Sequence, residues 1–419
     1  METGLRRRWL YLLPAIFITY SLAYVDRANF GFGIAAGLGA TLHIGAKNAS
    51  LLAGLFFLGY FSSQIPGTIL ADKFSIAKAV FVALVAWGSF AALTGAIHQF
   101  WLLALDRLLL GVAEGLVFPV MLLLLSRWFT RAERSRANTI LILANPVTVL
   151  WMSTITGYFI DRLGWQRTFI AEGLPAIAWA VVWILIVRDR PSKAKWLGPQ
   201  AGEELERRLA EEQTHIAPVT SARKIWFGSD VLLLSAEYFC WSLAVYGFVL
   251  WLPTIVRRGT TVSMTRIGLL SALPYLAAIV LMLLAATIGD KTRRLRSVVW
   301  PFLLASGMAL FGSFHFAQRS FVLAFVCLVL AGGCMYAPYG PFFAIVPERV
   351  PRNATAKAMA LINSCGALGG FFGSYLVGLL QAVTGNSKAG YLLMSSALIV
   401  AAILMLFLPD MPQADRTIV

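Results

Sequence analysis

Charged residues are scarce in this chain of 419 residues, of which 13% are charged and 59% are hydrophobic. Soluble globular proteins carry about 25% charged residues, so this composition excludes a soluble protein. Cysteine and histidine are also rare, with four of each, and no two cysteines have C-x-x-C spacing. These residues form disulfide frameworks and bind zinc, so we expect neither a disulfide nor a metal site.

Long apolar runs make up most of the sequence. They are close to the ~20 residues that an α-helix needs to cross about 30 Å of hydrocarbon. A β-barrel would show alternating segments of ~10 residues instead. We therefore predict an all-α membrane protein with twelve transmembrane helices in two six-helix halves. The predicted spans are 10–40, 48–70, 77–97, 100–125, 137–160, 167–188, 229–256, 263–288, 296–316, 320–345, 355–381 and 388–408.

The formal net charge is +15, which in a soluble protein would suggest binding to nucleic acid. In membrane proteins lysine and arginine accumulate in the cytoplasmic segments, and this rule accounts for the charge better. The basic stretch 6–8 places the N-terminus in the cytoplasm, and twelve spans return the C-terminus to the same side. We expect a multi-pass protein whose partner is the lipid bilayer, with no nucleic acid.

One long polar stretch divides the chain between the sixth and seventh predicted spans. It contains three prolines and a helical run of Glu, Arg and Leu at 203–209. We predict an N-terminal six-helix bundle at 1–190, a cytoplasmic linker with an amphipathic helix at 191–224, and a C-terminal six-helix bundle with a short tail at 225–419. Two such halves indicate an internal repeat, which is common in secondary transporters.

Four charged residues lie in the middle of the first and fourth predicted spans: Asp26, Arg27, Arg107 and Glu114. A charge at the centre of a span costs roughly 2.5–3.5 kcal/mol on insertion scales, so these residues are expected to have a function. We expect the two spans to face each other across a water-filled cavity. Asp26 would pair with Arg107 and Arg27 with Glu114, because adjacent side chains on a helix diverge by about 100°. The alternative is a purely structural ion pair.

Two cytoplasmic loops at equivalent positions of the halves carry an acid followed by basic residues. These are Asp72 and Lys73 in the first loop, and Asp290, Lys291 and Arg293 in the second. An acid at a helix end can pair with a basic group or a helix N-terminus across the seam between the halves, and so hold one conformation. The alternative is that these charges only determine topology.

Several stretches carry a resemblance to a known family: 24–29, 56–60, 107–115, 127–137, 164–167, 172–176 and 336–343, together with the paired loops. The chain resembles the major facilitator superfamily, and within it the anion:cation symporter family. Among members it looks most similar to bacterial sugar-acid carriers of the 2-ketogluconate and L-galactonate type. The resemblance covers nearly the whole chain and implies a location in the bacterial cytoplasmic (inner) membrane.

The central charges suggest a mechanism. Arginine holds a carboxylate with a planar fork, so Arg27 and Arg107 are expected to bind an anionic substrate. When the carboxylate that pairs with such an arginine is protonated, the arginine becomes free to bind the substrate. Binding of the proton and binding of the anion would then favour each other. Glu114 is the first choice for the coupling proton and Asp26 the second. The resemblance implies the same four positions. We expect no cofactor, and the proton is the coupling ion.

Polar side chains elsewhere in the spans are candidates for contacts with sugar hydroxyl groups. They are Tyr60, Gln64, Asn145, Tyr246, Tyr339 and Asn363. Each has an alternative role as a polar contact between helices, and the resemblance implies that residues near Asn363 face the substrate. Gly111 and Gly115 would let another helix or the substrate approach the fourth span.

The remaining acids of the spans are expected at their ends. Asp106 and Glu237 would reach water, and the role of Glu237 stays open. Asp161 and Glu172 would cap helices or meet Arg162 and Arg167.

The sequence therefore favours a secondary active transporter that takes up a sugar-acid anion with protons by alternating access. We expect it to act as a monomer in the membrane. An antiporter for organic anions or organophosphates is the alternative, and two central arginines argue against a cationic drug as substrate. We do not expect the protein to be an enzyme, because the sequence lacks paired catalytic histidines, a nucleophile elbow and cofactor motifs. A sensor would need a signalling domain, for which the cytoplasmic parts are too short.

Overall fold

The computed structural model describes residues 2–214, 228–260, 262–292, 294–350 and 355–409. The chain divides into two compact units. Unit 1 comprises Met1–His43, Leu55–Pro218 and Ser263–Gly268, and unit 2 comprises Ile44–Gly54, Val219–Val262 and Leu269–Val419. The units therefore differ from the division expected from the sequence, because two short segments are grouped with the other half of the chain.

Every regular element in the described residues is helical. The elements up to the linker are α1 (Glu2–Ala36), α2 (Leu38–Thr41), α3 (Ala46–Lys73), α4 (Ile76–Thr94), α5 (Phe100–Gly115), α6 (Val117–Trp128), α7 (Arg131–Ile186), the 3-10 helix η1 (Pro191–Lys193) and α8 (Pro199–Thr214). The later elements are α10 (Ser229–Gly259), α11 (Met264–Thr292), α12 (Leu295–Phe316), α13 (Phe321–Tyr336), α14 (Tyr339–Arg349), α15 (Thr355–Thr384) and α16 (Lys388–Phe407).

By length and composition, eleven helical segments in the described ranges could cross a membrane. One of them, Arg136–Ile186 in α7, is 51 residues long and contains two of the predicted spans. They are joined at Gly164, whose φ of 77° and ψ of 163° break the helix in a conformation that glycine adopts without strain. This double segment accounts for all twelve predicted spans.

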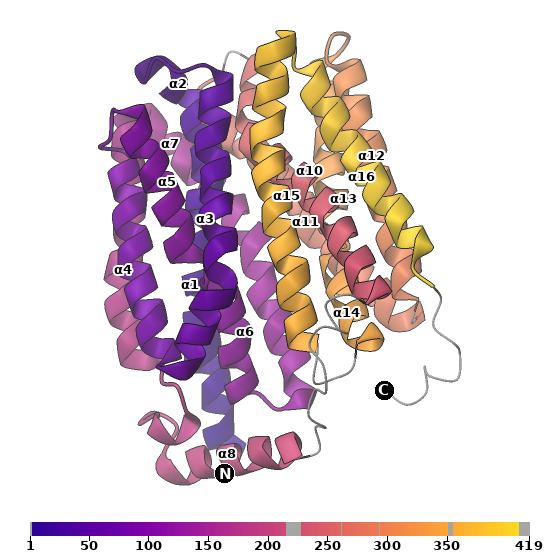
Figure 1. Ribbon diagram of the computed structural model, residues 1–419. Helices are drawn as coiled ribbons and strands as arrows, with labels where there is room; N and C mark the ends of the chain where they lie inside the picture. Colours follow the sequence, from indigo (N-terminus) through magenta and orange to yellow (C-terminus); the bar gives the residue numbers. More distant parts are fainter. Residues whose placement is uncertain (1, 215–227, 261, 293, 351–354, 410–419) are drawn as a thin grey trace. The chain divides into compact units, whose positions relative to one another are not determined.

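In unit 1, α1 and α4 pack against α7, and α5 packs against α4 (Figure 1). Glycine lets α3 and α5 approach closely. A Cβ atom on Gly111 would lie 1.9 Å from the carbonyl oxygen of Phe56, and one on Gly115 would lie 2.3 Å from that of Tyr60. The approach of another helix to these two glycines is thus confirmed, and the helix is α3.

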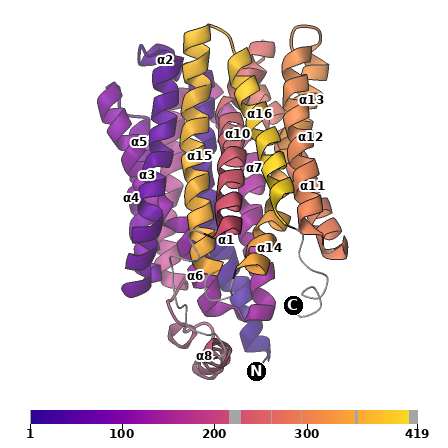
Figure 2. The same ribbon diagram turned by 45° about the vertical axis from the view of Figure 1, so that its right-hand side comes forward.

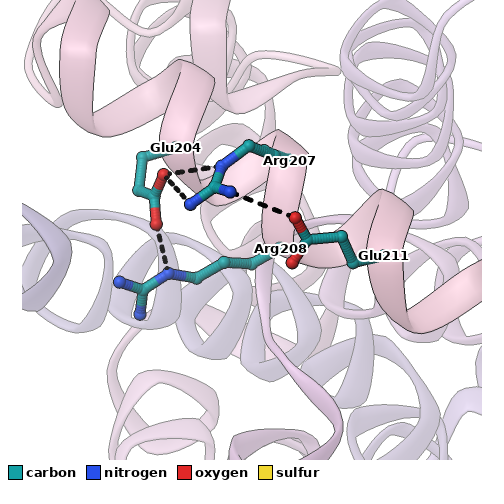
Figure 3. Close-up of polar contacts among 4 residues, drawn as sticks. All are labelled: Glu204, Arg207, Arg208 and Glu211. Carbon is teal, nitrogen blue, oxygen red and sulfur yellow. Dashed lines mark hydrogen bonds and ion pairs between the residues drawn. The ribbon is translucent and has the colours of Figure 1, made fainter.

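Helix α8 lies crosswise at the end of unit 1 where the N-terminus is found (Figure 1). It contains the run 203–209 predicted to be amphipathic. Leu205 is buried and Leu209 nearly so, while the opposite face carries an ion-pair network (Figure 3). There the carboxylate of Glu204 accepts hydrogen bonds from Arg208 Nε at 2.7 Å and Arg207 Nη2 at 2.8 Å. Arg207 also reaches Glu211 at 3.2 Å.

In unit 2, α10 packs against α15 and α16, and α12 packs against α13 and α16 (Figure 2). The core of this unit is aromatic. Trp241 of α10 is fully buried, and its Nε1 donates a hydrogen bond of 2.8 Å to the carbonyl oxygen of Met335 at the end of α13. Its ring centroid lies 4.4 Å from that of Tyr339, the first residue of α14. These contacts fix α13 and α14 on α10.

Candidate transport site

The centre of unit 1 holds a buried ion pair between α1 and α5. Arg27 Nε donates a hydrogen bond of 2.7 Å to Glu114 Oε1, and Arg27 Nη2 donates to the same oxygen. The two side chains are 3% and 0% exposed. The predicted pairing of Arg27 with Glu114 is therefore present. Because both donors share Oε1, the buried Oε2 of Glu114 has no hydrogen-bond partner.

In the described residues Arg107 is buried without a direct ion pair, although Asp106, Asp26 and Glu114 interact electrostatically with it. It is 2% exposed, and in the described part of the chain its guanidinium group takes part in no hydrogen bond or ion pair. The guanidinium carbon instead lies 4.3 Å from the ring centroid of Phe30 and 5.3 Å from that of Phe56. These contacts are cation–π interactions, which stabilise the charge only in part.

The predicted direct pair between Asp26 and Arg107 is wrong. Within the described residues no ion pair joins them inside 4.0 Å, although the two charges interact electrostatically. The physical reason is that the guanidinium group of Arg107 packs against the aromatic rings of Phe30 and Phe56. Asp26, which is 5% exposed, therefore lies close to Arg107, Arg27 and Glu114 without binding any of them directly.

The polar candidates of unit 1 lie on α3 and α7. The ring centroid of Tyr60 is 4.5 Å from the Arg27 guanidinium carbon, so this tyrosine borders the ion pair. Gln64, one turn further along α3, is 2% exposed. Asn145 of α7 is 7% exposed, and its side-chain oxygen is buried without a hydrogen-bond partner. The structure thus brings Tyr60 to Arg27 and leaves an acceptor on Asn145 available.

The polar candidates of unit 2 differ in burial. Tyr339 is buried among aromatic rings, with centroids 4.4 Å from Trp241 and 5.6 Å from Tyr336. This packing favours the alternative role of a contact between helices. Tyr246 of α10 and Asn363 of α15 are both half-buried. Their predicted contacts with a substrate stay predictions.

Of the predicted latch residues, Asp72 has the clearest partner. Its carboxylate forms an ion pair with Arg127 at the end of α6, within unit 1, whereas the expected partner lay across the seam between the halves. Lys73 lies 5.7 Å from the ring of Phe74, and Lys291 is exposed in the last turn of α11. Arg293 and the side chain of Asp290 lie outside the described residues.

Two acids expected to reach water are buried. Asp106 is 4% exposed and accepts a hydrogen bond of 2.7 Å from Thr94 Oγ1. Glu237 of α10 is fully buried, and neither of its carboxyl oxygens has a hydrogen-bond partner in the described residues. The predictions of solvated ends are therefore wrong, because neighbouring helices cover both positions.

Of the two acids expected to cap helices or meet arginines, Asp161 fulfils the expectation and Glu172 does not. Asp161 caps a helix, as predicted, and that helix is α11: its carboxylate accepts from the N–H groups of Met264 and Thr265 at 2.9 and 2.7 Å. Glu172 caps nothing and does not meet Arg162 or Arg167, which are exposed.

The partners of Glu172 were missed by reasoning from the sequence. They are Asn29 on α1 and Thr156, which precedes the Gly164 break in α7. One feature of the sequence could have indicated these partners: Asn29 lies one helical turn after Asp26, on nearly the same face of the helix.

Comparison with known proteins gives a consistent picture. The chain matches the Major Facilitator Superfamily over residues 16–374 and 255–418. It is 34% identical to a "Quinolone resistance transporter" of Acinetobacter baumannii, covering 94% of this chain and 92% of that protein. It is 31% identical to a "Putative tartrate transporter" of Agrobacterium vitis, covering 96% and 94%. A solved inward open structure of the xylose transporter XylE from E. coli shares the fold at 14% identity, with a TM-score of 0.78 over 96% of both chains.

Proposed function

Because the chain belongs to the major facilitator superfamily, whose members are membrane transporters and not enzymes, we propose that it is a proton-coupled symporter for an organic anion. The substrate class is a sugar acid such as 2-ketogluconate or a hexonate, taken up by alternating access. Under this proposal the chain would be a member of the anion:cation symporter family. Relatives named as putative tartrate transporters, whose substrate name denotes a hydroxylated acid anion, support the class.

The observation that carries the proposal is the guanidinium group of Arg107, which is buried and has no direct hydrogen bond or ion pair in the described residues. A buried charge without a partner is costly, and the cost disappears when an anion binds it. An arginine can hold a carboxylate through two parallel hydrogen bonds. Arg27 lies on the neighbouring helix and is already engaged by Glu114. The site therefore has one arginine ready for an anion and a second that a carboxylate occupies.

Proton coupling follows from the second arginine. With Asp26, Arg27, Arg107 and Glu114 all ionised, the site has no net charge. A proton that binds the unpartnered Oε2 of Glu114 neutralises this carboxylate and weakens its hold on Arg27. The site then carries one excess positive charge, which the substrate carboxylate neutralises. Proton and anion therefore favour each other's binding, as symport requires.

The proposed location of the protein rests on its resemblance to bacterial transporters. We propose a bacterial inner-membrane protein with both termini in the cytoplasm, acting as a monomer on small-molecule anions and protons. The ion pair of Asp72 with Arg127 supports a role for this loop as a conformational latch, since it ties the ends of two membrane helices.

The test is uptake into liposomes that contain the purified protein. An inward proton gradient should drive accumulation of one radiolabelled acid among hexonates, keto-hexonates, hexuronates and tartrate. Neutral sugars of the same stereochemistry should not compete. Accumulation that does not depend on the proton gradient would contradict proton coupling. Transport of neutral sugars alone would contradict the proposed anion-binding site.

A second candidate function is export by exchange with protons. It is favoured by the 34% identity to a protein named as a quinolone resistance transporter. Quinolones carry a carboxylate, so the same arginines could hold one. The direction of proton flow separates the two: an exporter expels its substrate when protons enter, and the sugar acids above would then not accumulate.

A further inference from the structure

Another buried carboxyl group of unit 1, that of Glu172, lies in a closed ring of hydrogen bonds. The residue is 8% exposed, on the part of α7 that follows the Gly164 break. Its Oε2 is bonded to Asn29 Nδ2 of α1, and its Oε1 lies 2.7 Å from Thr156 Oγ1. The same Thr156 oxygen lies 2.9 Å from Asn29 Oδ1. Three side chains thus share three mutual contacts.

The number of available hydrogens decides the charge of this ring. An ionised glutamate only accepts hydrogen bonds. Asn29 then supplies one hydrogen within the ring, and the Thr156 hydroxyl supplies a single one. Two hydrogens cannot fill three contacts, so two oxygen atoms would face each other without a proton between them. Such a contact between two oxygen atoms is unfavourable in a buried site.

A proton on Glu172 fills the missing position. The acid donates from Oε1 to the Thr156 hydroxyl, the hydroxyl donates to Asn29 Oδ1, and the Asn29 amide donates to Glu172 Oε2. The conclusion does not depend on the orientation of the amide, which is assigned from such networks. With the amide reversed, Glu172 must donate to its oxygen, and a proton is again required.

We propose that Glu172 is a proton-binding site of this protein, separate from the Arg27–Glu114 pair and occupied in this conformation. The bound proton closes a ring that fastens α1 to the two arms of α7 on either side of Gly164. Loss of the proton would break one contact and leave a buried negative charge, so the ring opens when the proton leaves.

The charged surroundings support a neutral acid. On α1 the facing group is Asp26, whose negative charge repels an ionised Glu172. On α4 the sole ionisable side chain is Lys78, ten residues from Gly88, and it is Gly88 that packs against Gly173 beside the acid.

The remaining neighbours supply no cation either. The arginine of α6, Arg127, is in the last turn and pairs with Asp72. On α7 itself Arg162 and Arg167 are exposed. Among the described residues, therefore, no cationic side chain forms an ion pair with Glu172.

Infrared spectroscopy of the purified protein, without substrate and at neutral pH, tests the proposal. Isotope labelling of glutamate identifies the carbonyl band of a protonated carboxyl group. We expect one such band to disappear in Glu172→Gln and to persist in the matched control Glu237→Gln. In Thr156→Val the band should shift, because the acid loses the hydroxyl to which it donates. Identical spectra of the wild type and Glu172→Gln would overturn the proposal.

Thermal unfolding provides a second measurement that does not depend on infrared assignment. The amide of Gln donates and accepts at the positions of the protonated acid, so Glu172→Gln should keep the unfolding temperature of the wild type. Glu172→Leu should lower it, because Asn29 and Thr156 lose their partner. A Gln variant as unstable as the Leu variant would contradict the ring. Neither measurement requires transport, so failure of the proposed function leaves this test unchanged.

Discussion

Two of the networks that join glutamate to arginine in the described residues differ in burial. Arg27 and Glu114 meet between α1 and α5, with side chains 3% and 0% exposed. On α8, Glu204 is held by Arg207 and Arg208, whose side chains are 65% and 51% exposed (Figure 3). The nitrogen–oxygen distance of 2.7 Å from Arg27 Nε to Glu114 equals that from Arg208 Nε to Glu204. Hydrogen-bond geometry alone therefore does not distinguish the two.

What distinguishes them is the consequence of losing one partner. On α8 water solvates the remaining charge, so an exposed pair contributes little. Between α1 and α5 the remaining charge stays buried in the protein and is left uncompensated. A buried pair is thus sensitive to any event that changes one of its charges. Binding of a proton or a substrate anion is such an event, which is why this pair suits a transport cycle.

The largest effect is expected for Arg27→Ala. Removal of one member of a buried ion pair costs about 3–5 kcal/mol, because the other charge remains buried. We expect a strongly reduced unfolding temperature and no uptake. The double variant Arg27→Met with Glu114→Met should recover the unfolding temperature but not uptake. If Arg27→Ala unfolds like the wild type, the pair is not the buried unit described here.

Glu114→Gln should affect transport more than folding. The amide can still accept from Arg27 but cannot exchange a proton, so it mimics the protonated acid. We expect loss of accumulation driven by a proton gradient, while exchange of internal for external substrate continues. Both are measured in liposomes with labelled substrate. Undiminished proton-driven accumulation would remove Glu114 from the coupling step.

Arg107→Met should weaken substrate binding with little effect on stability. In the described residues no carboxylate loses a direct hydrogen bond when this arginine is removed. Loss of hydrogen bonds to a charged ligand costs about 1.5–3 kcal/mol, so KM should rise at least about tenfold. Uptake kinetics and thermal unfolding measured together provide the check. A fall in unfolding temperature as large as that of Arg27→Ala would show that Arg107 is structural.

The smallest effect is expected for Glu204→Gln on α8. Hydrogen bonds from Arg208 and Arg207 lower the pKa of Glu204 below its ordinary value. A lowered pKa means that the network stabilises the fold above the ordinary pKa of a glutamate, and that this contribution is lost as the pH falls through the lowered value. At neutral pH uptake should equal that of the wild type. A clear loss of uptake would show that α8 takes part in transport.

The sequence by itself determined the transmembrane helices and the pair of Arg27 with Glu114. Apolar runs of sufficient length form helices in a bilayer regardless of their neighbours, because the backbone must satisfy its hydrogen bonds internally. The central charges were equally visible, since such residues are rare in membrane spans. Even the close approach at Gly111 was predictable, because only glycine leaves room for another backbone.

Only the tertiary structure decided which partners the other buried polar groups find. Arg107 was expected to bind Asp26 and instead lies on two aromatic rings, and Glu172 was expected at a helix end and instead closes a ring with Asn29 and Thr156. Glu237 was expected in water and is buried. Spacing along one helix fixes which side chains share a face. The rotation and depth of the neighbouring helix, which the packing of the whole unit sets, fix what that face meets.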